Sequence, residues 1–172
     1  MKYLTLLVLL LGLAIGACAQ GTINFSNLPD VSIPTPMPNG YGGVNWTGVF
    51  YVNPWEWDGS GPGFKHVLSN LGKDVAFSPY ACGSVTCYAS ISTVDGKGFL
   101  LVAATAAGGY YSKTPLPLIA RAYSHGQYVG TQTFMLTTDL QQLDFPSEWG
   151  AITQVVFQGS VVFYDMTLQI LP

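Results

Sequence analysis

After residue 19, apolar and polar residues alternate in short runs that are separated by Gly, Pro, Asn and Asp. Alternation places successive side chains on opposite faces of an extended strand, whereas a helix repeats its apolar positions every ~3.6 residues. Helical repeats are almost absent from this part of the chain. Many short runs bounded by turn residues are typical of a sandwich or barrel. The pattern therefore predicts one all-β domain with antiparallel strands.

The predicted strands are short. We expect them at residues 21–25, 46–52, 64–68, 74–78, 86–92, 98–105, 116–124, 128–137, 152–158 and 161–171. Between the first two lie Pro29, Pro34, Pro36 and Pro38, which cannot donate backbone hydrogen bonds to a neighbouring strand. This connection is therefore predicted to run extended along the surface, without regular pairing.

Two dipeptides predict hairpin turns. Asp95-Gly96 separates the run ending at Val94 from the strand that starts at Gly98, and His125-Gly126 separates strands 116–124 and 128–137. Type I′ hairpin turns need positive φ at both central positions, and Asp and Gly tolerate it. We therefore expect antiparallel neighbours on either side of each turn.

The last predicted strand, 161–171, has two distinct faces. Its even-numbered residues from Val162 to Ile170 include Met166 and Leu168, and they are predicted to face the core. The opposite set contains Asp165, which is expected either to face solvent or to have a specific task.

The first nineteen residues, MKYLTLLVLLLGLAIGACA, have the organisation of a signal peptide. Lys2 supplies the positive charge, residues 4–15 the apolar run, and Ala17-Cys18-Ala19 a small-x-small cleavage pattern. A transmembrane span needs about 20 apolar residues, and this run ends sooner. We expect a signal peptide at 1–19, a single mature domain at 20–172, secretion, and no membrane association after cleavage.

Cys18 leaves a second location open. Residues 15–18, Ile-Gly-Ala-Cys, also resemble a lipobox, which in a bacterium would anchor the protein through lipid on Cys18. If Cys18 is removed with the leader, Cys82 and Cys87 remain. Two cysteines with four residues between them in an exported chain predict a disulfide that closes a short loop. Their spacing differs from the redox-active C-x-x-C pattern.

The predicted mature chain is acidic and poor in charge. Once Lys2 is removed, five basic side chains remain against nine acidic ones. Nucleic acid calls for basic patches, so it is excluded as a partner, and no basic cluster is present to attract anionic lipid. Frequent Gly, Ser, Thr, Asn, Tyr and Trp favour a surface of hydroxyls, amides and aromatic tips. Such a surface suits neutral extracellular partners.

Two N-x-[ST] sequons occur, at Asn24 and Asn45, and they are meaningful in a eukaryotic secretory route. Asn24 falls within predicted strand 21–25, where pairing would restrict access. Asn45 follows a Gly-rich turn, so it is the preferred glycosylation site.

Several blocks of the chain carry a family resemblance. They are Ile23-Asn24-Phe25 with Leu28, the segment PNGYGGVNW at 38–46, GQYVGTQTF at 126–134, VVF at 155–157 and FYDMTL at 163–168. These blocks resemble a set of small secreted proteins, common in fungi and also found in bacteria. That set opens INF-x-x-L, continues with PNGYGG-x-NW, and has a G-x-x-V-G-T-x-T-F strand and closing VTF and F-x-x-DN-L-T-I strands. The resemblance covers most of the mature chain in patches.

This resemblance implies a jelly-roll sandwich of the galactose-binding or carbohydrate-binding-module kind, without an established activity. In such folds a structural calcium often lies where the N-terminal and C-terminal strands run side by side, and Asp165 matches the closing Asp. Ser26 and Asn27 replace the opening acidic pair, and Met166 replaces an Asn. Calcium needs several oxygen ligands with sufficient negative charge. We therefore expect no cofactor, with Asp165 as the one candidate metal ligand.

Aromatic residues gather after predicted strand 46–52. In an extended segment the odd-numbered residues of 51–57 share one side, although Pro54 interrupts a regular strand. Sugar rings have apolar C–H faces rimmed by hydroxyls, which match flat aromatic rings beside polar acceptors. Glu56 and Asp58 join this face only if the chain turns. The candidate binding residues are Tyr51, Asn53, Trp55, Glu56, Trp57 and Asp58. Alternatively, a Trp here closes the end of the sandwich.

Catalytic patterns are sparse. The chain contains no H-x-H, H-E-x-x-H or G-x-S-x-G sequence. We expect a non-catalytic domain that recognises a glycan or another extracellular surface. Two alternatives stay open: a small glycan-active hydrolase or lyase that uses Glu56 and Asp58, and a structural or host-interaction protein without a small ligand.

Overall fold

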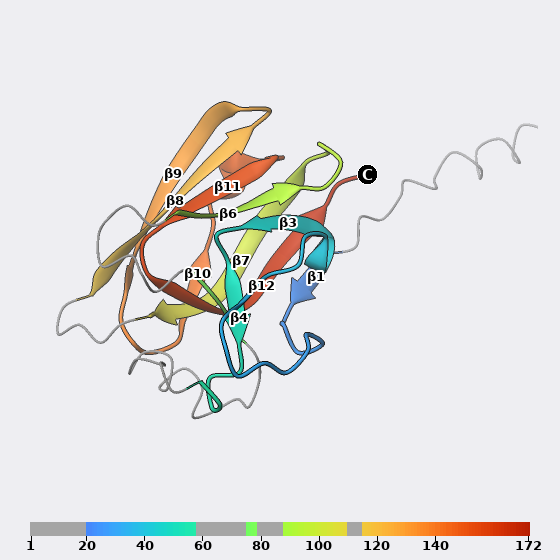
Figure 1. Ribbon diagram of the computed structural model, residues 1–172. Helices are drawn as coiled ribbons and strands as arrows, with labels where there is room; N and C mark the ends of the chain where they lie inside the picture. The colour runs from blue at the N-terminus through green and yellow to red at the C-terminus, as the bar shows by residue number, and fades with distance from the viewer. Residues whose placement is uncertain (1–19, 58–74, 79–87, 110–114) are drawn as a thin grey trace, which may run out of the picture.

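The computed structural model describes residues 20–57, 75–78, 88–109 and 115–172, and two antiparallel sheets dominate them (Figure 1). The seven-stranded sheet runs in the order β10 (Gln141–Asp144), β7 (Phe99–Gly108), β12 (Val161–Ile170), β5 (Val75–Phe77), β4 (Phe50–Val52) and β2 (Thr35–Pro36), with β1 (Gln20–Ile23) also paired to β12. The five-stranded sheet runs β3 (Val44–Thr47), β6 (Tyr88–Thr93), β11 (Gln154–Gln158), β8 (Leu116–Ser124) and β9 (Gln127–Leu136). The prediction of an all-β antiparallel sandwich is confirmed.

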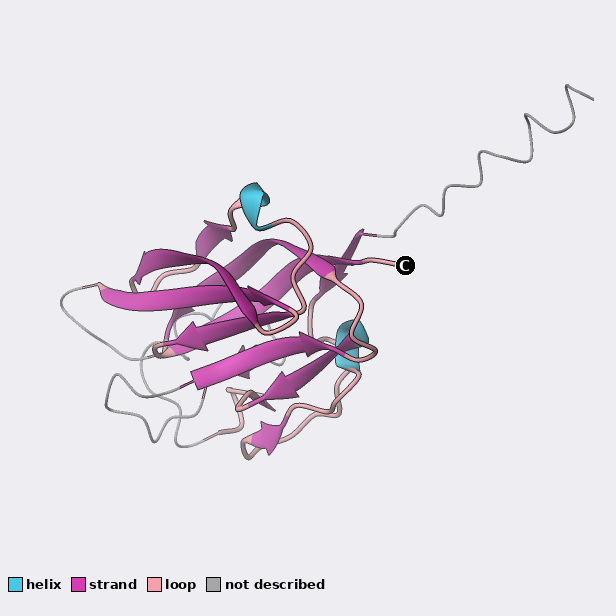
Figure 2. Cartoon of the chain, turned by 90° about the horizontal axis from the view of Figure 1, so that it is seen from above, coloured by secondary structure: helices cyan, strands magenta, loops and turns pink. Residues whose placement is uncertain are grey.

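Helical structure in the described chain is limited to two short 3-10 turns, η1 (Tyr41–Gly43) and η2 (Ser147–Trp149) (Figure 2). None of the described helical turns has the length and apolar character needed to cross a membrane. The predicted leader, the predicted strand 64–68 and the predicted Cys82–Cys87 disulfide all lie outside the described residues.

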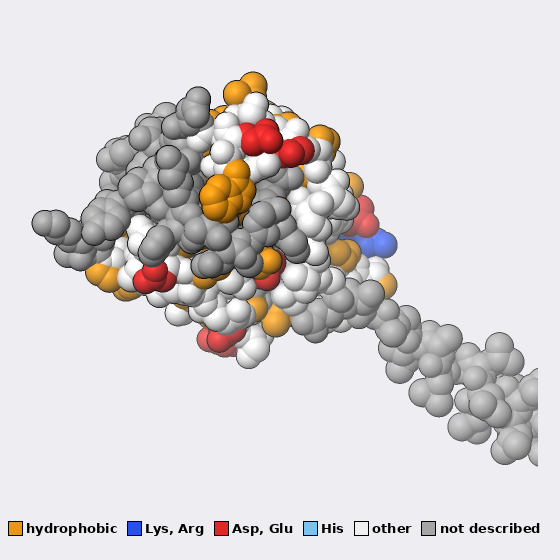
Figure 3. All heavy atoms as spheres, turned by 90° about the horizontal axis from the view of Figure 1, so that it is seen from below, with side chains coloured by type: hydrophobic (Ala, Val, Ile, Leu, Met, Phe, Trp, Pro, Cys, Tyr) orange, Lys and Arg blue, Asp and Glu red, His pale blue; other side chains and the backbone are white. Residues whose placement is uncertain are grey.

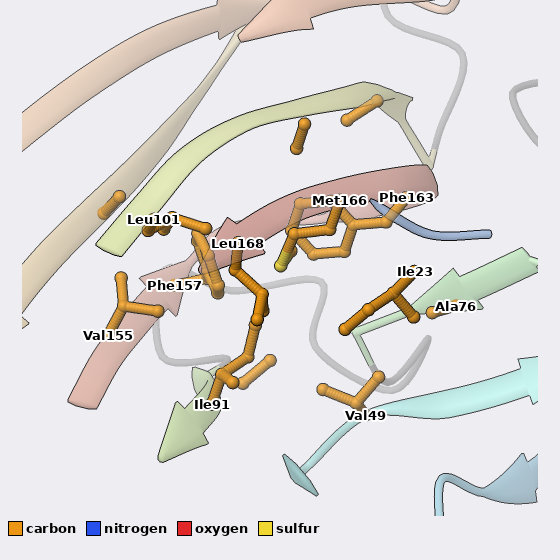
Figure 4. Close-up of a cluster of buried hydrophobic side chains, with 14 of the residues drawn as sticks. Ile23, Val49, Ala76, Ile91, Leu101, Val155, Phe157, Phe163, Met166 and Leu168 are labelled. Atoms are coloured by element: carbon orange, nitrogen blue, oxygen red, sulfur yellow. The ribbon is translucent and has the colours of Figure 1, made fainter. Parts of the chain in front are cut away.

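The core lies between the two sheets. Phe157 on β11 meets Phe163 on β12 with ring centroids 5.1 Å apart, so large side chains from opposite sheets interlock (Figure 4). Small alanines, such as Ala104 and Ala106 on β7, leave room for these rings. A second, smaller cluster contains Val52, Val75, Phe77, Ala107 and Val162, with Phe50, Trp57 and Leu140 packed against it. Burial of apolar side chains from both sheets is the main stabilising contribution in such a fold.

The last strand contains a bulge that the alternation did not predict. Phe163 pairs with Ala106 and Asp165 with Thr105, so Tyr164 is the extra residue on β12. The bulge changes which residues face the main core: the odd-numbered Phe163 does so before it, and the even-numbered Met166 and Leu168 do so after it. Val162 faces the other side and belongs to the second cluster. The prediction that the even-numbered residues all face one core is therefore wrong for Val162 and for the half-buried Tyr164, and Val161 and Phe163 of the opposite set lie in the main core.

Asp165 has a structural partner at this bulge. Its Oδ1 accepts a hydrogen bond of 3.1 Å from the backbone N–H of Thr105. A bulge interrupts the ladder and exposes backbone groups that need new partners. The carboxylate supplies one, which answers the question that the sequence left open about this residue.

The two predicted hairpin turns have different outcomes. His125 and Gly126 have φ values of 49° and 78°, and they join β8 to β9 as paired neighbours. Gly96 also has a positive φ, 78°, but Asp95-Gly96 carries the chain from β6 in one sheet to β7 in the other. The hairpin prediction is confirmed for the first turn and wrong for the second, because dipeptide signals report local backbone shape and not the choice of sheet.

Two further differences concern the N-terminal half. Predicted strand 46–52 is split at Gly48, which has a φ of 65°, into β3 and β4 of different sheets. The Pro-rich connection does pair, but only through the two-residue strand β2, whose Pro36 lies at the edge of the seven-stranded sheet. An edge position is where a strand tolerates proline, because the missing N–H can face away from its neighbour.

Candidate functional site

The aromatic face predicted for residues 51–57 does not form. The strand β4 ends at Val52, and the chain then turns, with the Glu56 N–H donating to the Asn53 carbonyl at 3.2 Å. Tyr51 is buried in the main core, and Trp57 is half-buried and stacked on Phe77 at 5.7 Å. The prediction of one shared side is therefore wrong, because the turn sends these rings in different directions.

Trp55 remains as an exposed aromatic side chain, with 61% of its surface accessible. Asn53 fixes the turn that carries it: its Oδ1 accepts from the Trp55 N–H at 3.1 Å, and its Nδ2 donates to Asp30 Oδ1 at 2.8 Å. Glu56 is exposed beside it, and Asp58 lies outside the described residues. We call Asp30, Asn53, Trp55 and Glu56 the Trp55 turn. Asp30 had no sequence signal, because it belongs to a separate Pro-rich segment.

The surface seen from below carries scattered acidic side chains, with basic groups confined to one edge of the described part (Figure 3). This distribution follows from the excess of acidic over basic residues in the chain. A neutral ligand avoids electrostatic repulsion here, whereas a polyanion would meet it.

A second candidate site is a groove beside the first strand, with a volume of about 620 Å³. The end of β1, the turn at residues 24–27, the η1 turn and the end of β12 form its walls. We call it the N-terminal groove. Its lining has polar side chains from Thr22, Asn24, Ser26 and Asn27, an aromatic ring from Tyr41 and an apolar side chain from Ile170.

One wall of the groove depends on Phe25. This residue is fully buried and has a φ of 55°, in the left-handed region that non-glycine residues rarely adopt. Its ring stacks on Tyr41 at 6.1 Å and meets Trp46 edge-on at 6.0 Å. Anchoring by these rings offsets the backbone strain. The tight turn that follows, closed by the Leu28 N–H on the Phe25 carbonyl at 3.2 Å, exposes Ser26 and Asn27, and Asn24 is exposed just before it.

The PNGYGG segment builds the opposite wall. Gly42 has a φ of 65°, and a Cβ added there would lie 2.3 Å from Ile23 Cδ1. The Trp46 indole N–H donates to the Tyr41 carbonyl at 2.8 Å, which ties the turn to β3. Glycine is needed at residue 42 for both its backbone conformation and its close contact with β1. This explains the local sequence without any reference to function.

The polar groups of the groove are neutral and partly pre-oriented. Asn24 Oδ1 accepts from both the N–H and the hydroxyl of Ser26, at 3.2 and 2.7 Å, and the Tyr41 hydroxyl donates to Asn27 Oδ1 at 2.5 Å. Neither Asn24 nor Asn27 donates through Nδ2 to another described residue. These two amide donors are available to a ligand. No side chain among the lining residues is charged, so the groove supports hydrogen bonding and not acid–base chemistry.

The residues present do not fit a structural calcium. β1 does run beside β12, with Ile23 opposite Met166, as the family resemblance implied. However, the Asp165 carboxylate is engaged by the Thr105 N–H, and the described residues contain no cluster of three His, Cys, Asp or Glu side chains. Calcium needs several oxygen ligands that include carboxylates.

The two sequons are placed differently from the expectation. Asn24 is exposed and lies just beyond the end of β1, whereas Asn45 is half-buried within β3 and donates to the Thr93 carbonyl at 3.3 Å. The preference for Asn45 on grounds of access is therefore wrong. Glycosylation itself stays a prediction.

The chain resembles solved structures in its fold. A DUF4465 family protein from Bacteroides caccae ATCC 43185 has 10% sequence identity, covers 87% of this chain and 92% of its own, and superposes with a TM-score of 0.56. A family 32 CBM from C. perfringens NanJ, solved in complex with galactose, has 11% identity, covers 80% of this chain and 98% of its own, and has a TM-score of 0.33. No family model matches the sequence, and a search of curated proteins finds no relative. At 10% identity, the similarity to the DUF4465 family protein supports the sandwich fold and nothing further.

Proposed function

We propose that this protein is a secreted, non-catalytic domain that recognises a neutral glycan in the N-terminal groove. The observation that carries the proposal is the groove itself, a concavity of about 620 Å³ lined by neutral amides and hydroxyls. Ligand sites typically have volumes of about 300–1,000 Å³ and a few fixed polar groups. A sugar presents hydroxyls that accept from amide N–H groups and donate to hydroxyl oxygens.

Pre-orientation of the polar groups strengthens this assignment. Asn27 is held by the Tyr41 hydroxyl, and Asn24 is held by Ser26, so both amides lose little rotamer freedom when a ligand binds. Tyr41 and Ile170 add apolar surface for the C–H faces of a sugar ring. The absence of charge among the lining residues favours a neutral saccharide over an acidic or basic one.

The Trp55 turn is a second candidate location for the same function. Its indole is 61% exposed, so a flat aromatic face with a polar N–H is accessible to a sugar ring. Asp30 and Glu56 provide carboxylate acceptors for sugar hydroxyls beside it. The groove and the turn can be separated experimentally because their polar residues are not shared.

The test is a titration of the ¹⁵N-labelled secreted protein with cello-, xylo-, manno- and galacto-oligosaccharides. Binding in the groove is expected to shift the side-chain amide signals of Asn24 and Asn27, and to leave the Trp55 indole signal unchanged. In the Asn27→Ala variant, affinity is expected to fall about tenfold, because a ligand hydrogen bond and the Tyr41 tether are lost. Trp55→Ala is the matched control and should bind as the unmodified protein does.

The outcomes separate the alternatives. If Trp55→Ala loses saccharide binding and Asn27→Ala keeps it, the site lies at the Trp55 turn. If none of these saccharides binds saturably, the proposal is overturned in favour of a structural or host-interaction role. Release of reducing ends that Glu56→Gln abolishes would establish the hydrolase or lyase. Well-dispersed backbone amide signals in the NMR spectrum of every variant would show that each one is folded.

A further inference from the structure

The outward face of the five-stranded sheet is chemically unlike the rest of the protein. The register pairs Tyr123 with both Tyr128 and Gln154, and it pairs Arg121 with Thr131. Directly paired residues point to the same side of a sheet, and the alternate residues Ala120, Ala122, Val155 and Phe157 are buried in the core. The set Arg121, Tyr123, Tyr128, Thr131, Gln154 and Gln158 therefore lies together on the outer face, which we call the outer platform.

Aromatic groups on this platform are held in place. The Tyr123 and Tyr128 rings meet edge-on with centroids 6.0 Å apart, and the hydroxyls of Tyr128 and Thr131 are hydrogen-bonded at 2.7 Å. Tyr128 is 60% exposed despite these contacts. On the same row as Gln158 lies Tyr88 of β6, which is also exposed. Rigid, exposed tyrosines provide contact area at little entropic cost.

The charge of the platform is opposite in sign to that of the whole chain. The five strands of this sheet contain no Asp or Glu, and Arg121 is their single charged residue. Its Nη1 donates to Gln158 Oε1 at 2.8 Å, and no described carboxylate pairs with it. By contrast, Lys97, the other described basic side chain, pairs with Asp95 at 3.6 Å. An unpaired, half-buried guanidinium among neutral polar groups retains donors for an anionic ligand.

We propose that the outer platform binds a linear polysaccharide that carries carboxylates. The guanidinium of Arg121, oriented by Gln158, offers a planar fork for a carboxylate, and the tyrosines on either side offer surfaces for sugar C–H faces. Five strands spaced about 4.8 Å apart make the face about 19 Å wide, an extended surface suited to a chain and not to a single sugar. None of the acidic residues lies on these five strands, and Coulomb energy falls with distance, so the contact with Arg121 outweighs their repulsion. This site is independent of the N-terminal groove.

The test measures affinity of the secreted protein for polygalacturonate oligomers by calorimetry, at low and at high ionic strength. Binding is expected to weaken as salt is added. Arg121→Gln is expected to lower affinity about tenfold at low salt and to remove most of the salt dependence, since a charge-assisted bidentate contact is lost. Tyr128→Ala should weaken binding at both salt concentrations. Lys97→Gln is the matched control, because it removes one positive charge away from the platform.

Several results would overturn the platform. One is the absence of polygalacturonate binding at low salt, and another is equal affinity of Arg121→Gln and the unmodified protein for polygalacturonate. A third is equal affinity of the unmodified protein for poly-L-glutamate and for polygalacturonate. That result would show attraction to negative charge or to an acidic peptide, without recognition of sugar. The Asn27→Ala variant should bind polygalacturonate normally, so failure of the groove and failure of the platform are distinguishable. Thermal melts of each variant establish that lost affinity does not reflect unfolding.

Discussion

The N-terminal groove and the Trp55 turn are both polar sites beside a turn, but they are built in different ways. The groove rests on a fully buried aromatic, Phe25, and on Gly42, where an added Cβ would lie 2.3 Å from Ile23 Cδ1. The Trp55 turn rests on Asn53 and its hydrogen bonds, and its aromatic side chain is exposed. The difference teaches that the shape of the groove is coupled to the stability of the core, whereas the turn can change with little effect on the fold.

The largest expected effect comes from Phe25→Ala. Removing a fully buried aromatic that contacts Tyr41 and Trp46 should lower the free energy of unfolding by about 3–5 kcal/mol and abolish glycan binding in the groove. Urea denaturation gives the stability. If the loss were below about 1 kcal/mol, which is typical of a surface position, the coupling between groove and core would be disproved.

A smaller loss is expected for Gly42→Ala. The φ of 65° and the close approach to Ile23 should cost about 1–3 kcal/mol and narrow the groove, so that saccharide affinity falls as well. Gly21→Ala is the matched control within the same groove, because an added Cβ there meets nothing within 4 Å and its φ is not positive. Equal stability of the two variants in thermal melts would contradict the conclusion that glycine is needed at residue 42.

Asn53→Ala should have a moderate effect on stability. It removes the hydrogen bonds to Asp30 and to the Trp55 N–H, in a partly exposed setting, and should cost about 1 kcal/mol. Faster hydrogen exchange at the Trp55 amide would show that the turn has loosened. Glu56→Gln, on the same turn, is expected to leave both the stability and this exchange rate unchanged.

The smallest effect is expected for Trp55→Ala, within about 0.5 kcal/mol of the unmodified protein, because an exposed side chain away from the core contributes little to stability. Trp57→Ala provides the contrast, since Trp57 stacks on Phe77 and its loss should be measurable in the same urea titration. Similar losses for the two variants would mean that Trp55 is also packed.

Alternation was sufficient to predict most strands and the sandwich, because a two-residue period is a direct consequence of backbone geometry. It failed where one extra residue enters a strand, at Tyr164, and where a strand changes sheet, at Gly48. Both events depend on tertiary packing that no local pattern records. The short strands β2 and β10 were missed for a related reason, since pairing at an edge needs a neighbour more than it needs a propensity.

The candidate sites were harder to predict than the fold. Residues 51–57 had an evident aromatic pattern, yet Tyr51 lies in the core from within β4, and the turn after Val52 places Trp57 on Phe77. The groove and the outer platform join segments distant in sequence, such as Asn27 with Tyr41 and Arg121 with Gln158. A signal for the groove did exist in the INF and PNGYGG blocks, but a motif alone did not reveal that they face each other.

The pairing of β1 with β12 has a consequence for how the chain matures. The hydroxyls of Thr22 and Thr167 are hydrogen-bonded across 145 positions of sequence, and β1 and β12 are the first and last described strands. Closing so long a loop carries an entropic cost before any contact repays it, which is the situation of slow-folding β proteins. The seven-stranded sheet, and with it the N-terminal groove, cannot be completed until nearly the whole chain has been synthesised.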